Sequence, residues 1–600
     1  MTTLVIYLDI DRHRFSIAIQ YRVCVCVSII NKESEIETND ISPCKQVLQK
    51  SSSQYRVVED IPEGSGSDSD SSDDDYMPET SSFESKGRGN GRGRGNGRGG
   101  QNNRLWARRD NLYEGNLPAF TGMVQVLAQG EEPVELFSSL FPDTLIDEIT
   151  FQSNMYALQQ GKENLYLSPA ELKVFLGINL TMTYIKYPRT RMYWSSNPGL
   201  RQNLIADPMP VNRFDEIKRY LHFADNNSQS ANGDRFFKLR PVLDVLQERF
   251  LEAVTPEEFH SIDEQIIPFK GRHSSKQYIP KKPKPWGFKV WVRAGSSGYA
   301  YRFELYQGAN GGRGDVGDLG MAADVVVRLC SDIYHNGHKV FFDNFFCSIA
   351  LLERLQQYGI EGTGTCRANR LKGAGDKLLG EKDMGKEGRG TSSVVSTADN
   401  ITVTRWLDSS SIHIASTCAG KYPEDRASRW KKTESRMIEI TRPFAVALYN
   451  KHMGGVDLVD QCLASYAHRR KNKRWYIRIF FHFLDLVCVN AWRLYQMKNG
   501  EERDLLSFKA SIAQGLINLG SQERRSRGRP VAQAQTPKRR HQVNTLHAVQ
   551  YGPGQHWPRS AVTKNAMRCR YEMCQKKTRF ICVQCQVSIC PDCFQGFHTR

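Results

Sequence analysis

The chain lacks a hydrophobic run long enough to cross a membrane. Its apolar patches near the N-terminus, at residues 4–8 and 23–30, are flanked and interrupted by Asp and Arg residues. A membrane-spanning helix needs about 20 predominantly apolar residues, and this segment also lacks the ordered regions and cleavage site of a signal peptide. We therefore expect a soluble intracellular protein with no membrane partner. Residues 1–50 show no pattern of a known fold.

Acidic side chains are outnumbered by basic ones. The chain has 82 Lys and Arg against 65 Asp and Glu, a formal net charge of +17. Such a balance favours an anionic partner, nucleic acid first, although a ribosomal-type or merely soluble basic protein shows it too. At 600 residues the chain is too long for one hydrophobic core, so three or more structural units are expected.

Cysteine is sparse over most of the chain and dense at its end. Six of the 15 Cys fall after residue 568. They are Cys569, Cys574, Cys582, Cys585, Cys590 and Cys593. Closely spaced cysteine pairs in a basic chain without a secretory signal favour zinc over disulfides.

The cysteine spacing also predicts how the ligands are shared. With His598 there are seven ligands, and two tetrahedral zinc ions need eight; His556 is the candidate for the eighth, with His541 and His547 as alternatives. Alternating pairs predict a cross-brace. One zinc would take Cys569, Cys574, Cys590 and Cys593, and the other His556, Cys582, Cys585 and His598. Ubiquitin ligases and histone readers have similar cross-braces, so zinc alone does not indicate DNA.

The composition changes along the chain in a way that predicts its organisation. Residues 51–85 are rich in Ser, Asp and Glu, and residues 86–100 in Gly and Arg, so both are expected to be disordered. The arginines suit either phosphate contact or a solubilising linker. Residues 116–258 have mostly helical patterns, including a capped helix start at Ser168.

From residue 259 the pattern becomes strand, hairpin, helix, strand, helix, strand. This order predicts a mixed sheet flanked by helices, and the whole chain is therefore a multidomain α+β protein. Residues 371–438 are predicted to be an insertion that interrupts the sheet domain. Helices are expected again at 441–451, 456–466 and 476–495.

Three aspartates fall where a sheet can bring them together. Asp263 lies within the first predicted strand, Asp343 at the end of a later one, and Asp457 at the start of a helix, with Asp460 on the same helical face. Converging carboxylates can hold two metal ions about 3.5–4 Å apart for phosphodiester cleavage, and Mg²⁺ prefers such oxygen ligands. Among 65 acidic residues, however, a triple of this kind arises easily, and each Asp alone is explained by a solvated turn or a helix cap.

The sequence around these aspartates resembles the piggyBac element transposase family. The resemblance runs from about residue 116 to the C-terminus, with several multi-residue words in the family's order. They are 212–214 (NRF), 219–223 (RYLHF), 238–241 (KLRP), 261–265 (SIDEQ), 283–289 (PKPWGFK), 341–346 (FFDNFF) and 449–457 (YNKHMGGVD).

The resemblance implies an RNase H-like catalytic core with two Mg²⁺ (or Mn²⁺) ions held by Asp263, Asp343 and Asp457, and Asp460 as a further acidic position. It also implies a helical dimerisation and DNA-binding domain split around that core and a C-terminal zinc domain that reads the element's end sequence. The expected boundaries are 1–115 for the leader, 116–258 and 458–535 for the split helical domain, 259–370 and 439–457 for the core, 371–438 for the insertion, 536–554 for a basic linker and 555–600 for the zinc domain.

The implied reaction is cut-and-paste transposition by a homodimer acting on double-stranded DNA. The element ends are nicked, the freed 3′-OH forms a hairpin on the opposite strand, and the resolved ends are integrated at TTAA sites. A domesticated, catalytically silent DNA-binding or chromatin protein is the alternative, because an intact triad does not separate the two. A zinc-module interaction protein, such as a ubiquitin ligase, leaves the aspartate words unexplained.

Two basic segments complete the expected contacts with DNA. In residues 468–476 we expect phosphate contacts from Arg469, Arg470, Lys471, Lys473 and Arg474. For Trp475 core packing is favoured over stacking on an unpaired base. The clusters at 524–529 and 538–540 resemble a two-part nuclear import signal and predict a nuclear location; a basic linker that touches DNA is the alternative.

Overall fold

The computed structural model describes residues 106–108, 117–228, 233–280, 284–308, 319–500, 503–526, 550–551, 556–561, 565–571 and 574–599. The predicted leader, apart from residues 106–108, lies outside these ranges, as do His541, His547 and the basic stretch 527–549 with most of the predicted import signal. Within the described ranges, no helix has the length and apolar character needed to cross a membrane.

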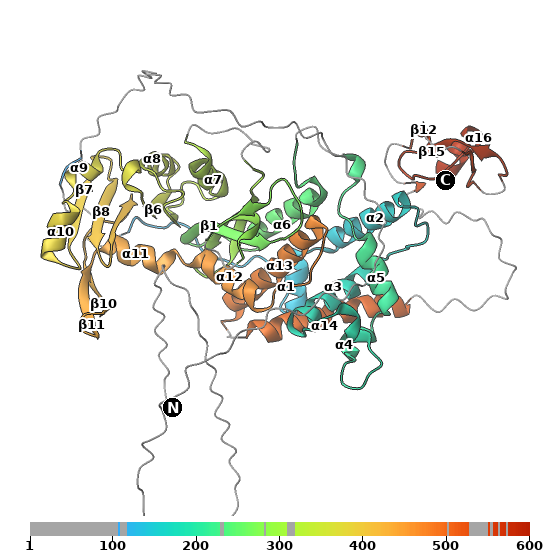
Figure 1. The fold of residues 1–600 in the computed structure, drawn as a ribbon, viewed down its shortest axis with the longest axis horizontal. Helices are drawn as coiled ribbons and strands as arrows, with labels where there is room; N and C mark the ends of the chain where they lie inside the picture. The colour runs from blue at the N-terminus through green and yellow to red at the C-terminus, as the bar shows by residue number, and fades with distance from the viewer. Residues whose placement is uncertain are drawn as a thin grey trace, which may run out of the picture. The chain divides into compact units, whose positions relative to one another are not determined.

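Helices from both ends of the described chain build the largest hydrophobic core. The first group is α1 (Pro133–Leu140), α2 (Asp143–Gln159), α3 (Pro169–Tyr184), α4 (Asn203–Ala206), α5 (Val211–Tyr220) and α6 (Arg240–Glu252). The second is α12 (Gly455–Ser465), α13 (Trp475–Asn499) and α14 (Leu505–Ser526). Helices α1 and α3 pack against α13 and α14, so segments more than 300 residues apart share one core (Figure 1).

Helix α3 lies at the centre of this core. Ser168 caps it as predicted, with its hydroxyl 3.2 Å from the Glu171 amide. Its buried residues occupy the whole circumference of the helix, because α14 packs along it as well as α2 and α4. Gly177 and Gly520 allow this approach, since a Cβ on either would lie within 2.6 Å of a backbone carbonyl of the other helix.

A nine-stranded mixed sheet carries the candidate site. In sequence order it comprises β1 (Phe259–Pro268), β2 (Gln277–Tyr278), β3 (Trp286–Gly295), β4 (Ala300–Leu305), β5 (Lys339–Phe342), β6 (Glu361–Thr365), β7 (Ser392–Ser396), β8 (Thr402–Leu407) and β9 (Ser411–Ser416). The spatial order is β2-β3-β1-β5-β6-β9-β8-β7, with β4 beside β3. Strands β1, β5 and β6 are parallel and the remaining pairs antiparallel. The mixed sheet that the sequence predicts is confirmed.

Each face of the sheet is covered because successive strand residues point to opposite sides. On one face Val340 and Phe342 pack with α7 (Met321–Leu329) and α8 (Ile349–Gln357). On the other, Phe341 packs with α11 (Phe444–His452). Further along the neighbouring strand β1, Ile267 packs into the large helical core. The sheet is therefore buried on both sides, as parallel strands require.

The segment predicted to be an insertion extends this sheet. Strand β9 pairs with β6, and β8 and β7 follow it, so the sheet continues through residues 392–416. Residues 106–108, which the sequence places in a disordered leader, pair with the outer edge: Ala107 and Ser396 exchange both backbone hydrogen bonds. Two short helices and a separate hairpin complete the segment: α9 (Ala374–Lys377), α10 (Glu381–Glu387), β10 (Asp425–Lys431) and β11 (Arg436–Arg442).

The C-terminal module is small and built around its cysteines. Its elements are β12 (Pro558–Ser560), β13 (Met567–Arg568), β14 (Lys577–Thr578), β15 (Phe580–Cys582) and α16 (Pro591–His598). Few apolar side chains besides the cysteines are buried within it, among them Val587, Ile589 and Phe597. Such a module has little hydrophobic core, and in small domains of this kind a structural metal commonly supplies the missing stability.

A buried ionic cluster joins the two long terminal helices. Asp485 of α13 accepts hydrogen bonds from Lys509 of α14 at 2.7 Å and from His468, at 2.9 Å from both its ring Nδ1 and its backbone amide. All three side chains are buried. Burial acts to raise the pKa of Asp485, but the two basic partners outweigh it and hold the pKa well below its usual range.

Replacing Asp485 by Asn is expected to lower the free energy of unfolding by about 3–5 kcal/mol, because the Lys509 charge is left buried without a counter-charge. Chemical denaturation with and without the substitution measures this loss. The control is Glu439→Gln, which breaks an exposed pair with Arg426 and should lower it by less than about 1 kcal/mol. Equal losses in the two variants would show that the cluster does not stabilise the helical core.

Candidate functional site

The sheet brings the first two predicted aspartates side by side. Strands β1 and β5 are parallel neighbours, and Ile262 is the register partner of Phe342. Asp263 and Asp343 are the next residues of the two strands, so they lie next to each other where β5 ends. Both side chains are half-buried.

The third aspartate reaches them through the start of α12. Gly455 lies so close to the sheet that a Cβ would be 2.4 Å from the Gly295 carbonyl and 2.7 Å from the Ser261 hydroxyl. The Val456 amide donates a hydrogen bond to that hydroxyl at 3.0 Å. Asp457 follows directly in the first turn of the helix, where it is exposed, and its charge acts on Asp263.

Burial and neighbouring negative charge act together on Asp263. Desolvation, followed by the charges of Asp343 and Asp457, raises the pKa of Asp263 from its usual value to about 7, although the Glu264 amide donates to Asp263 Oδ1 at 2.8 Å. The carboxylates do not form a tight cage for one ion. Among the described residues, groups of three or more potential ligand atoms all within 4.8 Å of one another occur only in the C-terminal module.

The loop after Asp343 is held by two arginines that the sequence did not single out. Arg370 donates to the carbonyls of Asn344, Phe345 and Cys347 at 2.9–3.2 Å, and Arg367 donates to the Asn344 side chain at 3.1 Å. The Phe345 amide donates to Asp343 Oδ1 at 2.7 Å. These bonds fix the direction of the Asp343 side chain, and their only sequence signal is a basic cluster following β6.

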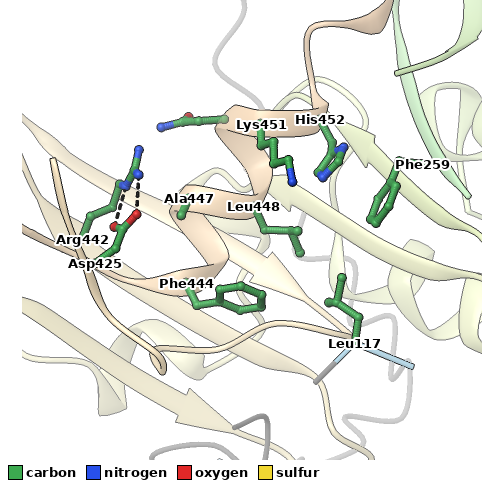
Figure 2. Close-up of a pocket in the computed structure, with 10 residues that line it drawn as sticks. Leu117, Phe259, Asp425, Arg442, Phe444, Ala447, Leu448, Lys451 and His452 are labelled. Atoms are coloured by element: carbon green, nitrogen blue, oxygen red, sulfur yellow. Dashed lines mark hydrogen bonds and ion pairs between the residues drawn. The ribbon is translucent and has the colours of Figure 1, made fainter. Parts of the chain in front are cut away.

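A pocket lies beside α11, the helix that precedes Asp457, and not at the carboxylates. It has a volume of about 560 Å³, and Figure 2 shows Leu117, Phe259 and Phe444 around its apolar part, with the Asp425–Arg442 ion pair at one side. At its other end the His452 ring stacks on Phe259 at 3.9 Å, and His452 Nδ1 lies 3.0 Å from the Ser296 hydroxyl. These contacts hold the end of α11 against the first residue of β1, and so support the turn into α12.

The five predicted DNA-binding side chains divide into two groups. Arg470 donates to the Asn179 side chain, and Arg474 to the carbonyls of Lys218 and Arg219. Arg469, Lys471 and Lys473 are exposed. DNA contact by any of the five remains a prediction, with the exposed three best placed for it. Trp475 is half-buried in the aromatic core beside Phe236 and His273, as favoured from the sequence.

The structure groups the eight predicted zinc ligands into the two sets that the spacing predicts. Within each set the ligand atoms all lie within 4.8 Å of one another. One set is Cys569, Cys574, Cys590 and Cys593, and the other is His556, Cys582, Cys585 and His598.

The distances within each set fit tetrahedral zinc. The sulfurs of Cys574 and Cys590 are 3.9 Å apart, and His556 Nδ1 lies 3.5 and 3.4 Å from the sulfurs of Cys582 and Cys585. With Zn–S near 2.3 Å and Zn–N near 2.0 Å, the edges of such a tetrahedron are about 3.8 Å (S–S) and about 3.5 Å (S–N). His598 Nδ1 donates to the Phe594 carbonyl at 2.8 Å, which leaves Nε2 free as a ligand.

Comparison with known proteins identifies the family. Residues 132–492 match the family model described as Transposase IS4, which makes the chain a member of the transposase class. It is 31% identical over 475 residues to PiggyBac transposable element-derived protein 3 of Homo sapiens, covering 78% of this chain and 76% of that protein. PiggyBac transposable element-derived protein 2 of Homo sapiens is 31% identical over 504 residues, with 83% and 82% covered. Within the transposases, the chain belongs to the piggyBac family, which confirms the resemblance seen in the sequence.

A solved structure shares the fold. The cryo-EM structure of the piggyBac transposase synaptic complex with hairpin DNA superposes with a TM-score of 0.54 at 20% sequence identity, covering 78% of this chain and 98% of that chain. This confirms the multidomain arrangement of a mixed sheet and helices.

The raised pKa of Asp263 predicts a pH-dependent stability in protein free of Mg²⁺ and Mn²⁺. Because the folded state binds this proton more tightly than the unfolded state, the free energy of unfolding falls as pH rises from about 4 to about 7. Asp263→Asn removes that loss. It should stabilise the protein by on the order of 2–4 kcal/mol at pH 8, and the gain should shrink toward pH 5.5. Calorimetric melting of the zinc-replete chain across this range measures it.

Asp399→Asn is the control, since Asp399 is exposed in the turn between β7 and β8. A gain from Asp263→Asn that is the same at pH 5.5 and pH 8 would mean that Asp263 does not titrate as described.

Proposed function

We propose that the chain is a cut-and-paste DNA transposase whose catalytic residues are Asp263, Asp343 and Asp457. The observation that carries this proposal is the convergence of carboxylates from β1, the end of β5 and the start of α12. At this point burial and the neighbouring charges raise the pKa of Asp263. Membership of the piggyBac family supports the same chemistry.

The donor set suits divalent cations. All three groups are carboxylates, the hard ligands that Mg²⁺ and Mn²⁺ prefer. A bound cation would also relieve the repulsion that raises the Asp263 pKa. Asp263, Asp343 and Asp457 would hold the ions, with Asp460 one turn further along α12 as an additional ligand.

Two such ions supply an activated water and stabilise the leaving oxygen of a phosphodiester. The protein's part is to orient the ligands. The Ser261–Val456 hydrogen bond sets the position of Asp457, and the Phe345 amide sets the direction of Asp343. The Glu264 amide holds Asp263 Oδ1. Following the family's reaction, the substrate would be double-stranded DNA, cut at the element ends through hairpin intermediates and joined at TTAA sites.

The architecture supports the remaining assignments. The run of β3, β1, β5 and β6, one antiparallel and three parallel strands, suits an RNase H-like core. The shared core of α1–α6 and α12–α14 suits a helical dimerisation and DNA-binding domain divided between residues 116–258 and 458–535. We accordingly propose a nuclear homodimer whose C-terminal module holds two zinc ions. A domesticated DNA-binding protein is the second candidate, favoured by the name "transposable element-derived" that both human relatives carry.

Excision from a reporter in the presence of Mg²⁺ tests the catalytic assignment. Asp263→Ala, Asp343→Ala and Asp457→Ala should each reduce excision at least about a hundredfold, because each removes charge stabilisation worth several kcal/mol in the transition state. Asp399→Ala, an exposed acidic control, should excise like the wild type. Equal excision by the triad variants would refute the mechanism, and a wild type that binds the element ends but never excises would favour the domesticated protein.

Metal analysis of the purified full chain tests the zinc assignment. The wild type should hold two zinc ions, and Cys585→Ala and Cys590→Ala should each lose one, because each removes a ligand from a different set. Cys462→Ser, a half-buried cysteine of α12, should keep both. Fewer than two ions in the wild type, or a loss on Cys462→Ser as large as on the ligand variants, would overturn the cross-brace.

A further inference from the structure

An aromatic pair at the β2 edge of the sheet is exposed without an evident structural role. Tyr278 of β2 and Trp286 of β3 are register partners, with side chains 56% and 47% exposed and ring centroids 4.8 Å apart. Lys276 Nζ lies 4.8 Å from the Trp286 ring centroid. Contiguous exposed apolar surface indicates a binding site more strongly than single scattered residues do.

The loop between α12 and α13 lies beside this pair. Arg478 donates to the Pro268 carbonyl at 3.0 Å, and the Trp475 ring lies 4.7 Å from His273, so the loop is held against the β1–β2 connection. Partial desolvation lowers the pKa of Lys284, whose residue is exposed, and the charges of Arg469 and Arg478 lower it further. These two guanidinium groups therefore lie near Lys284. Positive charge from two distant segments thus gathers next to exposed rings.

No acidic residue offsets this charge within either segment. The sequence has no Asp or Glu from residue 265 to 303, where it has nine Lys and Arg, and none from 461 to 484, where it has six. Three of these cations are paired with acidic residues from other segments, Lys289 with Glu264 and both Arg293 and Arg302 with Asp332. The positive charge that remains beside the aromatic faces suits a nucleic acid strand, which offers phosphates to the cations and base faces to the rings. An acidic protein partner would satisfy the charges but gives no reason for a paired aromatic platform.

We propose that Tyr278 and Trp286 stack on an unpaired base of a DNA strand whose phosphates bind Lys276, Lys284, Arg469 and Lys471. We call these six residues the aromatic–basic surface. The inference rests on the proposed function for its DNA partner and extends it to a specific strand contact. The surface lies at the far end of β1 from the carboxylates: Asp263 to Pro268 spans about 16 Å of strand, about five base pairs of duplex. It can therefore hold DNA that has opened a few base pairs from the cut.

Fluorescence anisotropy with the full zinc-replete chain tests the stacking contact. The two probes are a blunt duplex and the same duplex with a four-thymine 3′ overhang, both measured without added Mg²⁺. Tyr278→Ala/Trp286→Ala should weaken binding of the overhang duplex about tenfold, because stacking contributes about 1–3 kcal/mol per base, and change the blunt duplex less than about twofold. Tyr278→Phe/Trp286→Phe should bind both probes like the wild type.

Two further variants keep the outcome decisive. Trp430→Ala removes a comparably exposed tryptophan, 54% exposed on β10, and should change neither probe. Lys284→Ala leaves the rings in place and should weaken both probes, lowering the slope of log affinity against log salt by about one. If the double alanine variant melts early, the single substitutions Tyr278→Ala and Trp286→Ala decide, since each should weaken binding of the overhang duplex alone. Equal losses on both probes, or no loss on the overhang, would overturn the stacking contact.

The assay separates this inference from the proposed function because it needs no cutting. If the wild type binds neither probe, the proposal of a DNA partner is itself refuted. Binding of both probes with no dependence on Tyr278 and Trp286 removes only the aromatic contact. If the chain binds the overhang through the two rings but never excises, the aromatic–basic surface is supported and only the catalytic proposal is refuted.

Discussion

The contact between the first turn of α12 and the sheet is the constraint on which the candidate site depends. Two of the three carboxylates are brought together by strand pairing alone, because Asp263 lies on β1 beside Asp343, which directly follows β5. The third belongs to a helix nearly 200 residues later in the chain. Asp457 reaches the sheet only because Gly455 has no side chain to collide with the Gly295 carbonyl and because the Ser261 hydroxyl accepts a hydrogen bond from the Val456 amide. Burial and the charge of Asp343 raise the pKa of Asp263, and the approach of Asp457 adds to them.

The surrounding structure holds that contact in place from both sides. His452 stacks on Phe259 just before the turn, and α12 joins the large helical core through Val456 and Val459. That core ties α13 and α14 to the N-terminal helices, with Asp485 binding His468 and Lys509 at its centre. Arg478 then fastens the basic loop to the end of β1. One strand thus links the carboxylates to the aromatic–basic surface.

The sequence predicted features that depend on local pattern. Strands β1, β3, β4, β5 and β6, the cap at Ser168 and the grouping of cysteines all follow from periodicity, cap chemistry or ligand spacing. Helix α14 was missed, since Gly515 and Gly520 weaken its helical pattern. Those glycines are explained only by tertiary packing: a Cβ on Gly520 would lie 2.3 Å from the Ala170 carbonyl, and one on Gly515 2.7 Å from Val134. The continuation of the sheet into β7–β9 was equally hidden, because pairing across a Gly- and Lys-rich segment is a long-range property.

Charge was the least predictable property. The run 469–474 does not say which guanidinium groups bond to distant helices and which meet solvent. Arg470 donates to the Asn179 side chain, and Arg474 to the carbonyls of Lys218 and Arg219. The arginines that hold the Asp343 loop, Arg367 and Arg370, stand in a basic cluster whose contacts the sequence hides for the same reason. The three aspartates themselves were predicted from the family's words and not from spacing, since the turn at Gly455 that brings Asp457 to the sheet becomes visible only in the fold.

The central claim is that α12 must approach the sheet for the carboxylates to act as one metal site. The most direct measurement is a Mn²⁺ titration of the zinc-replete chain, followed by electron paramagnetic resonance, for the wild type and Gly455→Ala. The substitution removes no ligand, but its Cβ would collide with the Gly295 carbonyl. The account predicts Mn²⁺ binding at least about tenfold weaker, or about 1.4 kcal/mol. Unchanged Mn²⁺ affinity in a folded Gly455→Ala chain would contradict it.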